Sequence, residues 1–162
     1  MTKINGLLNQ VNLITTKNNE ILDATGSRFN LFKICGVNHY ENTHSAIIAE
    51  FLNPKGSHSL KSKFLESFIE TLGEYCSVPN FKTSTARVIT EHSTNEGRID
   101  ILIEDNDNRA IIIENKIYAG DQPEQLVRYD RFAKKYFNGY QILYLTLAGD
   151  FASDQAVPVS HI

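Results

Sequence analysis

The chain has 162 residues, 41% hydrophobic and 22% charged, as in an ordinary soluble globular domain. Its formal net charge of −3 argues against general polyanion binding but leaves room for a local basic groove beside an acidic metal site. The N-terminal segment has no apolar stretch long enough for a signal peptide or membrane span, so we expect a cytoplasmic protein in which Cys35 and Cys76 are reduced core thiols.

Residues 1–41 are predicted to form an N-terminal helical extension. Apolar residues recur at helical spacing from Ile4 to Leu22, and Thr25-Gly26 is a plausible stop signal. This helix is expected to pack on the domain or on a partner. The sequence leaves the oligomeric state open, a homo-oligomer included.

Two helices are predicted next. The first begins at Asn42 or Thr43, which are good N-caps, and ends before Pro54. The second is an amphipathic helix over residues 62–72, closed by Gly73. Around the start of the first helix, His39, Glu41 and His44 could mimic a metal cluster, but their spacing matches no zinc motif.

Residues 97–116 are predicted to form the central hairpin, after a first strand at residues 86–90. Two apolar runs, Ile99–Ile103 and Ala110–Ile113, flank an Asn- and Asp-rich turn. The second run does not alternate, which is typical of a strand buried between two layers.

The charged residues of this hairpin are predicted to converge. Glu114 and Lys116 are two apart and leave the same face of a strand. A turn centred on Asp107 would set Asp100 opposite Glu114. Two such carboxylates repel unless a cation lies between them or one is protonated, and a hard cation such as Mg²⁺ suits them. The alternative is structural: Asp100 caps a strand and Glu114 pairs with Lys116.

The rest of the chain predicts a helix, a strand and a tail. The helix begins with Asp121 as N-cap and Pro123 in its first turn, and runs to about Phe137. Residues 140–147 form the last strand. The tail, residues 148–162, lacks the further helices expected, which leaves open whether the chain is a fragment of a longer protein.

The hairpin resembles the signature of the PD-(D/E)XK nuclease superfamily: Asp100 on one strand, then Glu114-Asn115-Lys116 on the next. The family's proline before the aspartate is replaced by Ile99. The resemblance covers residues 42–147. It implies a restriction-endonuclease-like α/β fold with an αβββαβ core, a mixed four-stranded sheet flanked by helices.

This resemblance implies a metal-dependent nuclease that hydrolyses nucleic-acid phosphodiester bonds, with DNA favoured. Asp100 and Glu114 would bind one or two Mg²⁺ ions, for which Mn²⁺ would substitute. The Asn115 backbone carbonyl and Glu50 would be further ligands. Lys116 would orient the attacking water or stabilise the transition-state phosphate.

The helix after the hairpin adds a second resemblance. Gln125 and Tyr129 lie four apart on one helical face, and Gln-x-x-x-Tyr at this place resembles the motif of the RecB-like and lambda-exonuclease-like branches. In those branches the pair would help to place Lys116 or the substrate. Arg128 and Arg131, with Lys135, form a basic stripe that is either a solvated surface or a track for a phosphate backbone.

Other function classes fit the sequence less well. The same fold could serve as a non-cleaving nucleic-acid-binding or protein-interaction module, but such modules usually lose one of the acids or the lysine. No nucleophile elbow or catalytic cysteine motif is present. A glycoside hydrolase using Asp100 and Glu114 would leave Lys116 and the Gln-Tyr helix unexplained.

Overall fold

A computed structural model describes residues 2–26, 28–73, 77–118, 120, 122, 124–153 and 159–161. The chain divides into two units, residues 1–38 and residues 39–162, and each is described by itself. The predicted Asp121 cap, Pro123 and Cys76 lie outside the described residues, whereas Cys35 is a free, exposed thiol.

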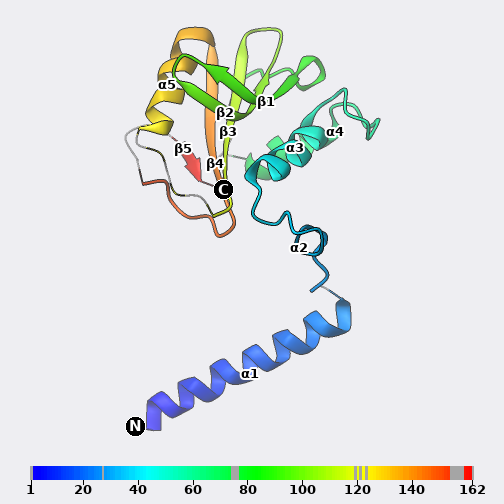
Figure 1. Cartoon of the computed structure of the whole chain (residues 1–162), viewed down its shortest axis with the longest axis vertical. Helices are drawn as coiled ribbons and strands as arrows, with labels where there is room; N and C mark the ends of the chain where they lie inside the picture. Colours follow the sequence, from blue (N-terminus) through cyan, green and yellow to red (C-terminus); the bar gives the residue numbers. More distant parts are fainter. Residues whose placement is uncertain are drawn as a thin grey trace. The chain divides into compact units, whose positions relative to one another are not determined.

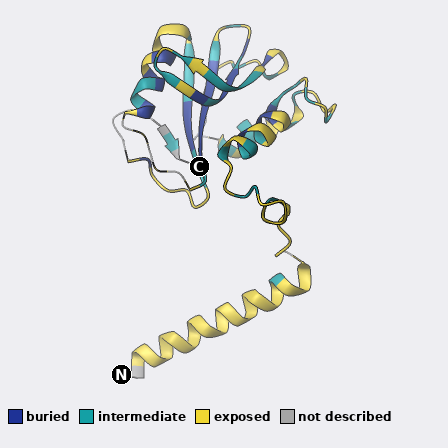
Figure 2. Cartoon of the chain, viewed as in Figure 1, coloured by how far each residue is buried: buried dark blue, intermediate teal, exposed yellow. Residues whose placement is uncertain are grey.

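The described residues of the first unit form two helices, α1 (Thr2–Thr25) and α2 (Leu31–Ile34). The side chain of Asn30 caps α2 by accepting a hydrogen bond from the Lys33 amide at 2.9 Å. The apolar residues of α1, from Ile4 to Ile21, are exposed (Figure 2). Among the described helices, none is both long and apolar enough to cross a membrane.

The second unit is a mixed sheet with helices on both faces (Figure 1). Its strands lie in the order β1-β2-β3-β4-β5; β1, β2 and β3 are antiparallel neighbours, whereas β4 runs parallel to β3 and to β5. The elements, in chain order, are α3 (Glu41–Leu52), α4 (Lys63–Leu72), the short 3-10 helix η2 (Thr83–Thr85), β1 (Arg87–Thr94), β2 (Gly97–Glu104), β3 (Arg109–Lys116), α5 (Gln125–Tyr136), β4 (Gly139–Thr146) and β5 (Val159–His161). The restriction-endonuclease-like fold is confirmed, with β5 as an addition to the four predicted strands.

The β2–β3 hairpin has the predicted register. Glu104 pairs with Ala110 and Ile101 pairs with Ile113, which places the turn centre at Asp107. The Asp105 carboxylate holds the turn, because it accepts hydrogen bonds from the amides of Asp107 and Arg109. This register brings Asp100 opposite Glu114.

The two faces of the β2–β3 hairpin pack against different helices. Leu102, Ala110 and Ile112 pack against α5, in a cluster with Leu126 and Phe132. The alternate residues pack against α3 and α4; they are Ile101, Ile103, Ile111 and Ile113, with Ala49, Leu52 and Leu65 opposite. Both sides of the central strands are therefore buried, as Figure 2 shows.

Candidate active site

The end of β3 places two charged side chains inside the protein. Glu114 and Lys116 leave the same face of the strand, where Lys116 Nζ lies 2.7 Å from Glu114 Oε1. Glu114 is 1% exposed and Lys116 9% exposed. Side chains of these types are seldom buried this deeply unless they are paired.

Asp100 joins this pair from β2. Its Oδ2 accepts a hydrogen bond from the Asn115 amide at 2.9 Å, so the carboxylate is fixed across the β2–β3 ladder. Asp100, Glu114 and Lys116 all line one cavity of about 340 Å³, here called the carboxylate cavity. The structure thus brings together the three ionisable side chains of the predicted site.

Burial and mutual repulsion disturb the titration of the two carboxylates. Burial, reinforced by the charge of Asp100, raises the pKa of Glu114 to about 7, although Lys116 and Tyr129 act in the opposite direction. Burial also raises the pKa of Asp100 against the hydrogen bond from Asn115. Burial disfavours the Lys116 ammonium, but Glu114 outweighs it and raises the pKa of Lys116. The cavity therefore favours a proton or an added cation.

The donor set fits a hard divalent cation. The described residues contain no group of three or more His, Cys, Asp or Glu side chains arranged to hold a metal, so the predicted alternative of a zinc-like His39–Glu41–His44 cluster is absent. Two carboxylates beside a polar cavity resemble instead the sparse protein ligation of Mg²⁺, which keeps waters and substrate oxygens in its shell. Asp100 and Glu114 are the side chains that could hold it.

Helix α5 orients Glu114 through two polar side chains. Gln125 Nε2 donates hydrogen bonds to Glu114 Oε1 at 2.8 Å and to Tyr129 Oη at 2.9 Å. Tyr129 Oη in turn lies 2.9 Å from Glu114 Oε2 and also contacts the Arg98 carbonyl. Burial raises the pKa of Tyr129, which keeps the phenol protonated as a donor. The Gln-Tyr pair contacts Glu114, and no such contact with Lys116 is seen in the described residues.

Asn115 ties the hairpin to α3. Its buried side chain donates hydrogen bonds to Ser45 Oγ at 3.1 Å and to the Glu41 carbonyl at 3.3 Å. The Asn115 side chain thus has structural contacts on the opposite face of β3, made by its Nδ2. Its Oδ1 has no hydrogen-bond partner among the described residues, and its backbone carbonyl is the atom predicted for metal ligation.

Glu50 does not reach the carboxylate cavity. It lies near the end of α3, where its Oε1 accepts hydrogen bonds from the Ser57 amide at 2.5 Å and from Ser57 Oγ at 2.7 Å. Those two bonds lower the pKa of Glu50 and hold the turn after α3. The prediction that Glu50 joins the acidic residues of the site is corrected by this placement.

Glu41 is the acidic residue of α3 that lines the cavity. Its Oε1 accepts a hydrogen bond from the Ile117 amide at 2.8 Å, directly after β3. The helical pattern could have revealed it, because Ser45, Ala49 and Leu52 are the buried positions of α3 and Glu41 is four residues before Ser45. From the sequence, Glu41 was placed only in the zinc-like alternative, because the helix was predicted to have its N-cap at Asn42 or Thr43, whereas the N-cap is Tyr40.

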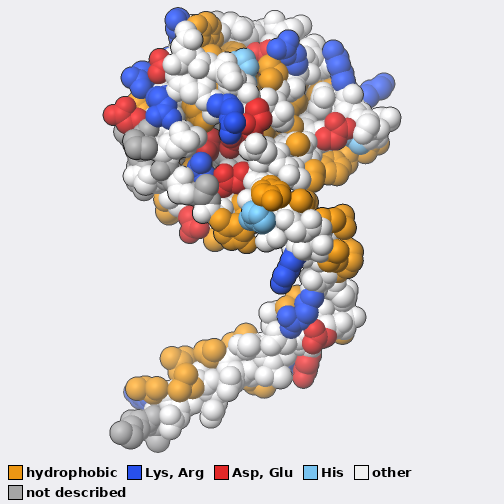
Figure 3. All heavy atoms as spheres, viewed as in Figure 1, with side chains coloured by type: hydrophobic (Ala, Val, Ile, Leu, Met, Phe, Trp, Pro, Cys, Tyr) orange, Lys and Arg blue, Asp and Glu red, His pale blue; other side chains and the backbone are white. Residues whose placement is uncertain are grey.

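The basic residues separate into two groups. Arg98 and Arg128 line the carboxylate cavity, whereas Arg131 and Lys135 line a different cavity at the other end of α5. Arg98 also pairs with Glu91, at 2.7 Å between Arg98 Nε and Glu91 Oε2. On the face shown in Figure 3, basic and acidic side chains are interspersed over the second unit.

An αβββαβ core that carries two carboxylates and a lysine on its central hairpin defines the restriction-endonuclease-like class. The family model of the PD-(D/E)XK nuclease superfamily matches residues 29–160, so the chain belongs to that superfamily. Comparison with curated proteins and with solved structures gave no match.

Proposed function

We propose that the protein hydrolyses nucleic-acid phosphodiester bonds with the help of Mg²⁺, and that DNA is its substrate. The observation that carries this proposal is the convergence of Asp100, Glu114 and Lys116 in one partly buried cavity. Membership of a nuclease superfamily supports the reaction class.

Each residue has a role in this proposal. Asp100, Glu114 and the Asn115 carbonyl would hold the cation, with Glu41 at the edge of the same cavity. A bound divalent cation supplies a lowered pKa for an attacking water and neutralises charge on the phosphate. Lys116 orients that water or stabilises the negative charge that grows on the phosphate.

The surrounding residues position these groups. Gln125 and Tyr129 hold both oxygens of Glu114, so the carboxylate keeps one orientation. This network also supports the finer proposal that the chain belongs with the RecB-like and lambda-exonuclease-like nucleases. Arg98 and Arg128 line the cavity and would contact phosphate oxygens of the substrate.

We also propose a cytoplasmic location. The free, exposed thiol of Cys35 suits a reducing compartment, in which nucleic-acid substrates are present.

The test is incubation of the purified chain with Mg²⁺ or Mn²⁺ and a panel of linear, circular, single-stranded and branched DNAs, with RNA for comparison. We expect metal-dependent cleavage of DNA that EDTA stops and that Asp100→Ala removes. Glu70→Ala, an exposed acid on α4, is the control. Retained cleavage in purified Asp100→Ala would falsify the assignment, and binding without cleavage in the wild type would favour a non-cleaving module.

A further inference from the structure

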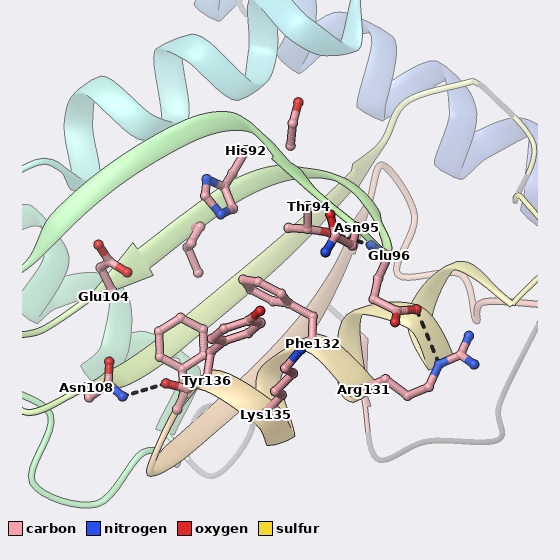
Figure 4. A pocket seen from close by; sticks show the side chains of 13 residues that line it. His92, Thr94, Asn95, Glu96, Glu104, Asn108, Arg131, Phe132, Lys135 and Tyr136 are labelled. Atoms are coloured by element: carbon pink, nitrogen blue, oxygen red, sulfur yellow. Dashed lines mark hydrogen bonds and ion pairs between the residues drawn. The ribbon is translucent and has the colours of Figure 1, made fainter.

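A second cavity, of about 570 Å³, lies along the C-terminal half of α5 (Figure 4). We call it the α5 pocket. Its walls come mainly from the end of β1, the β1–β2 turn, β2 and α5, and Asp100, Glu114 and Lys116 do not line it. Its volume is in the range of small-molecule sites.

Aromatic rings form one wall of the α5 pocket. The Phe132 ring lies 5.8 Å from His92 and 5.0 Å from Tyr136, measured between ring centroids. Tyr136 is 47% exposed, so part of its ring remains open to a ligand. Figure 4 shows these rings gathered between the hairpin and the helix. An aromatic surface of this kind suits a flat heterocycle such as a nucleobase. Stacking on aromatic side chains depends little on which base is bound.

Basic and acidic side chains edge the same pocket. Lys135 Nζ lies 5.1 Å from the Tyr136 ring centroid, and Lys135 has no carboxylate partner among the described residues. Arg131 is held loosely, 3.5 Å from Glu96 and 3.9 Å from Glu124. Both cations can therefore turn to a phosphate, while Glu96 can accept a hydrogen bond from an exocyclic amine of a base.

Helix α5 connects the two cavities. Arg128 lines the carboxylate cavity, and Arg131 and Lys135 line the α5 pocket. The helix advances about 10 Å from Arg128 to Lys135. At 3.4 Å per nucleotide in a duplex strand, this distance corresponds to about three nucleotides, and to fewer in a stretched single strand.

We propose that the α5 pocket holds an unpaired nucleotide of the strand whose phosphodiester lies in the carboxylate cavity. Its base stacks against Tyr136 and His92, and its phosphate contacts Arg131 and Lys135. A base inside a duplex is already stacked and paired, so the pocket selects a single-stranded segment. This inference rests on the proposed function, because the strand must lead into the carboxylate cavity.

The test is binding of a fluorescein-labelled 12-nucleotide single-stranded DNA in EDTA, measured by fluorescence anisotropy. We expect Tyr136→Ala to weaken binding roughly tenfold. We expect Lys135→Ala to weaken it severalfold and to reduce the salt dependence by about 0.7 in log–log slope. Lys134→Ala is the matched control, since Lys134 is the adjacent lysine, pairs with Asp130 and does not line the pocket. Binding of the blunt duplex of the same sequence should change little in all three variants.

Wild-type affinity in both Tyr136→Ala and Lys135→Ala would overturn the proposal, as would an equal loss for the duplex. Deoxyadenosine monophosphate provides a second arm. If Tyr136→Ala lost binding of this nucleotide while keeping full affinity for the single strand, the pocket would take a free nucleotide and the proposal would be wrong. The readout needs no cleavage, so an inactive wild type that still shows these losses contradicts the proposed function alone.

Discussion

The two faces of the β2–β3 hairpin are both buried but differ in chemistry. On the α3–α4 face, Ile101, Ile103, Ile111 and Ile113 pack as hydrocarbon and need only shape. On the α5 face, the apolar residues give way to Asp100, Glu114 and Lys116, each held by a hydrogen bond or an ion pair.

This difference between the two faces suggests that one face serves mainly stability and the other mainly function. Buried charges lose their hydration, and their mutual attraction offsets that loss only in good geometry. Isoleucine on the same strands carries no such cost. The apolar face can therefore fix the hairpin while the polar face keeps charges that folding alone would not favour. Substitutions on the two faces should therefore have different effects.

The largest expected effect is on the polar face. Lys116→Ala and Asp100→Asn should each lower kcat/KM for DNA cleavage at least about a thousandfold. The first removes positive charge at the reacting phosphate, and the second removes a carboxylate that would hold the cation. Single-turnover cleavage with Mn²⁺ measures this. The matched change on the other face, Ile113→Val, should leave cleavage within about twofold. Similar losses in all three variants would remove the distinction between the faces.

On the apolar face, the expected loss is in stability. Ile113→Ala should lower the free energy of unfolding by about 2–5 kcal/mol, because it leaves a cavity beneath α3 and α4. Urea denaturation followed by circular dichroism measures the change. Cleavage by the fraction that remains folded should be nearly normal. A fully folded but inactive Ile113→Ala protein would mean that this face contributes to the chemistry directly.

The pH dependence of protein stability should reveal the raised pKa of Glu114. The pKa of Glu114 rises from 4.5 to about 7 in the folded protein, so the folded state holds a proton that the unfolded state releases in this window. The stabilisation of the folded state by this bound proton is complete below pH 4.5 and is lost as the pH rises through 7. Relative to Glu114→Gln, the metal-free wild type should lose up to about 3 kcal/mol between pH 4.5 and pH 8.

Urea titrations in EDTA at several pH values measure this difference. Saturating Mn²⁺ should reduce it, since a cation stabilises the ionised carboxylate. Parallel pH profiles for the wild type and Glu114→Gln would show that Glu114 has an ordinary environment.

The smallest expected effect concerns the two glutamates of α3. Glu41→Ala should lower kcat/KM roughly tenfold, since Glu41 lines the cavity and holds the Ile117 amide after β3. Glu50→Ala should change it less than about twofold, because Glu50 is bound to Ser57. Initial cleavage rates compare the pair. A larger loss in Glu50→Ala would restore the prediction made from the sequence.

Most of the fold could be predicted from local sequence patterns. The Asn- and Asp-rich turn and the isoleucine runs determined the hairpin register, and that register is confirmed. The first strand was predicted too short: β1 continues to Thr94, since His92, Ser93 and Thr94 pair with β2 although they are polar. Strand β5 was missed, since three residues pairing with β4 leave no periodic signal.

The sequence was less informative about contacts between distant elements. Glu41 and Asn115 are joined by a hydrogen bond across 74 positions, and no local pattern predicts such a contact. Glu50 was favoured only because helices of this family often supply an acid. The α5 pocket could not be predicted from the sequence either, since His92 on β1 and Tyr136 come together only through the packing of α5 against the sheet.

The most direct test of the account is whether the carboxylate cavity binds a divalent cation. Isothermal titration calorimetry of the wild type with Mn²⁺ at pH 7.5 should show saturable heat, and Asp100→Ala and Glu114→Gln should remove it. Glu50→Ala should retain it. No saturable heat in the wild type, or equal heat in Asp100→Ala, would contradict the claim that these two carboxylates converge to hold a metal ion.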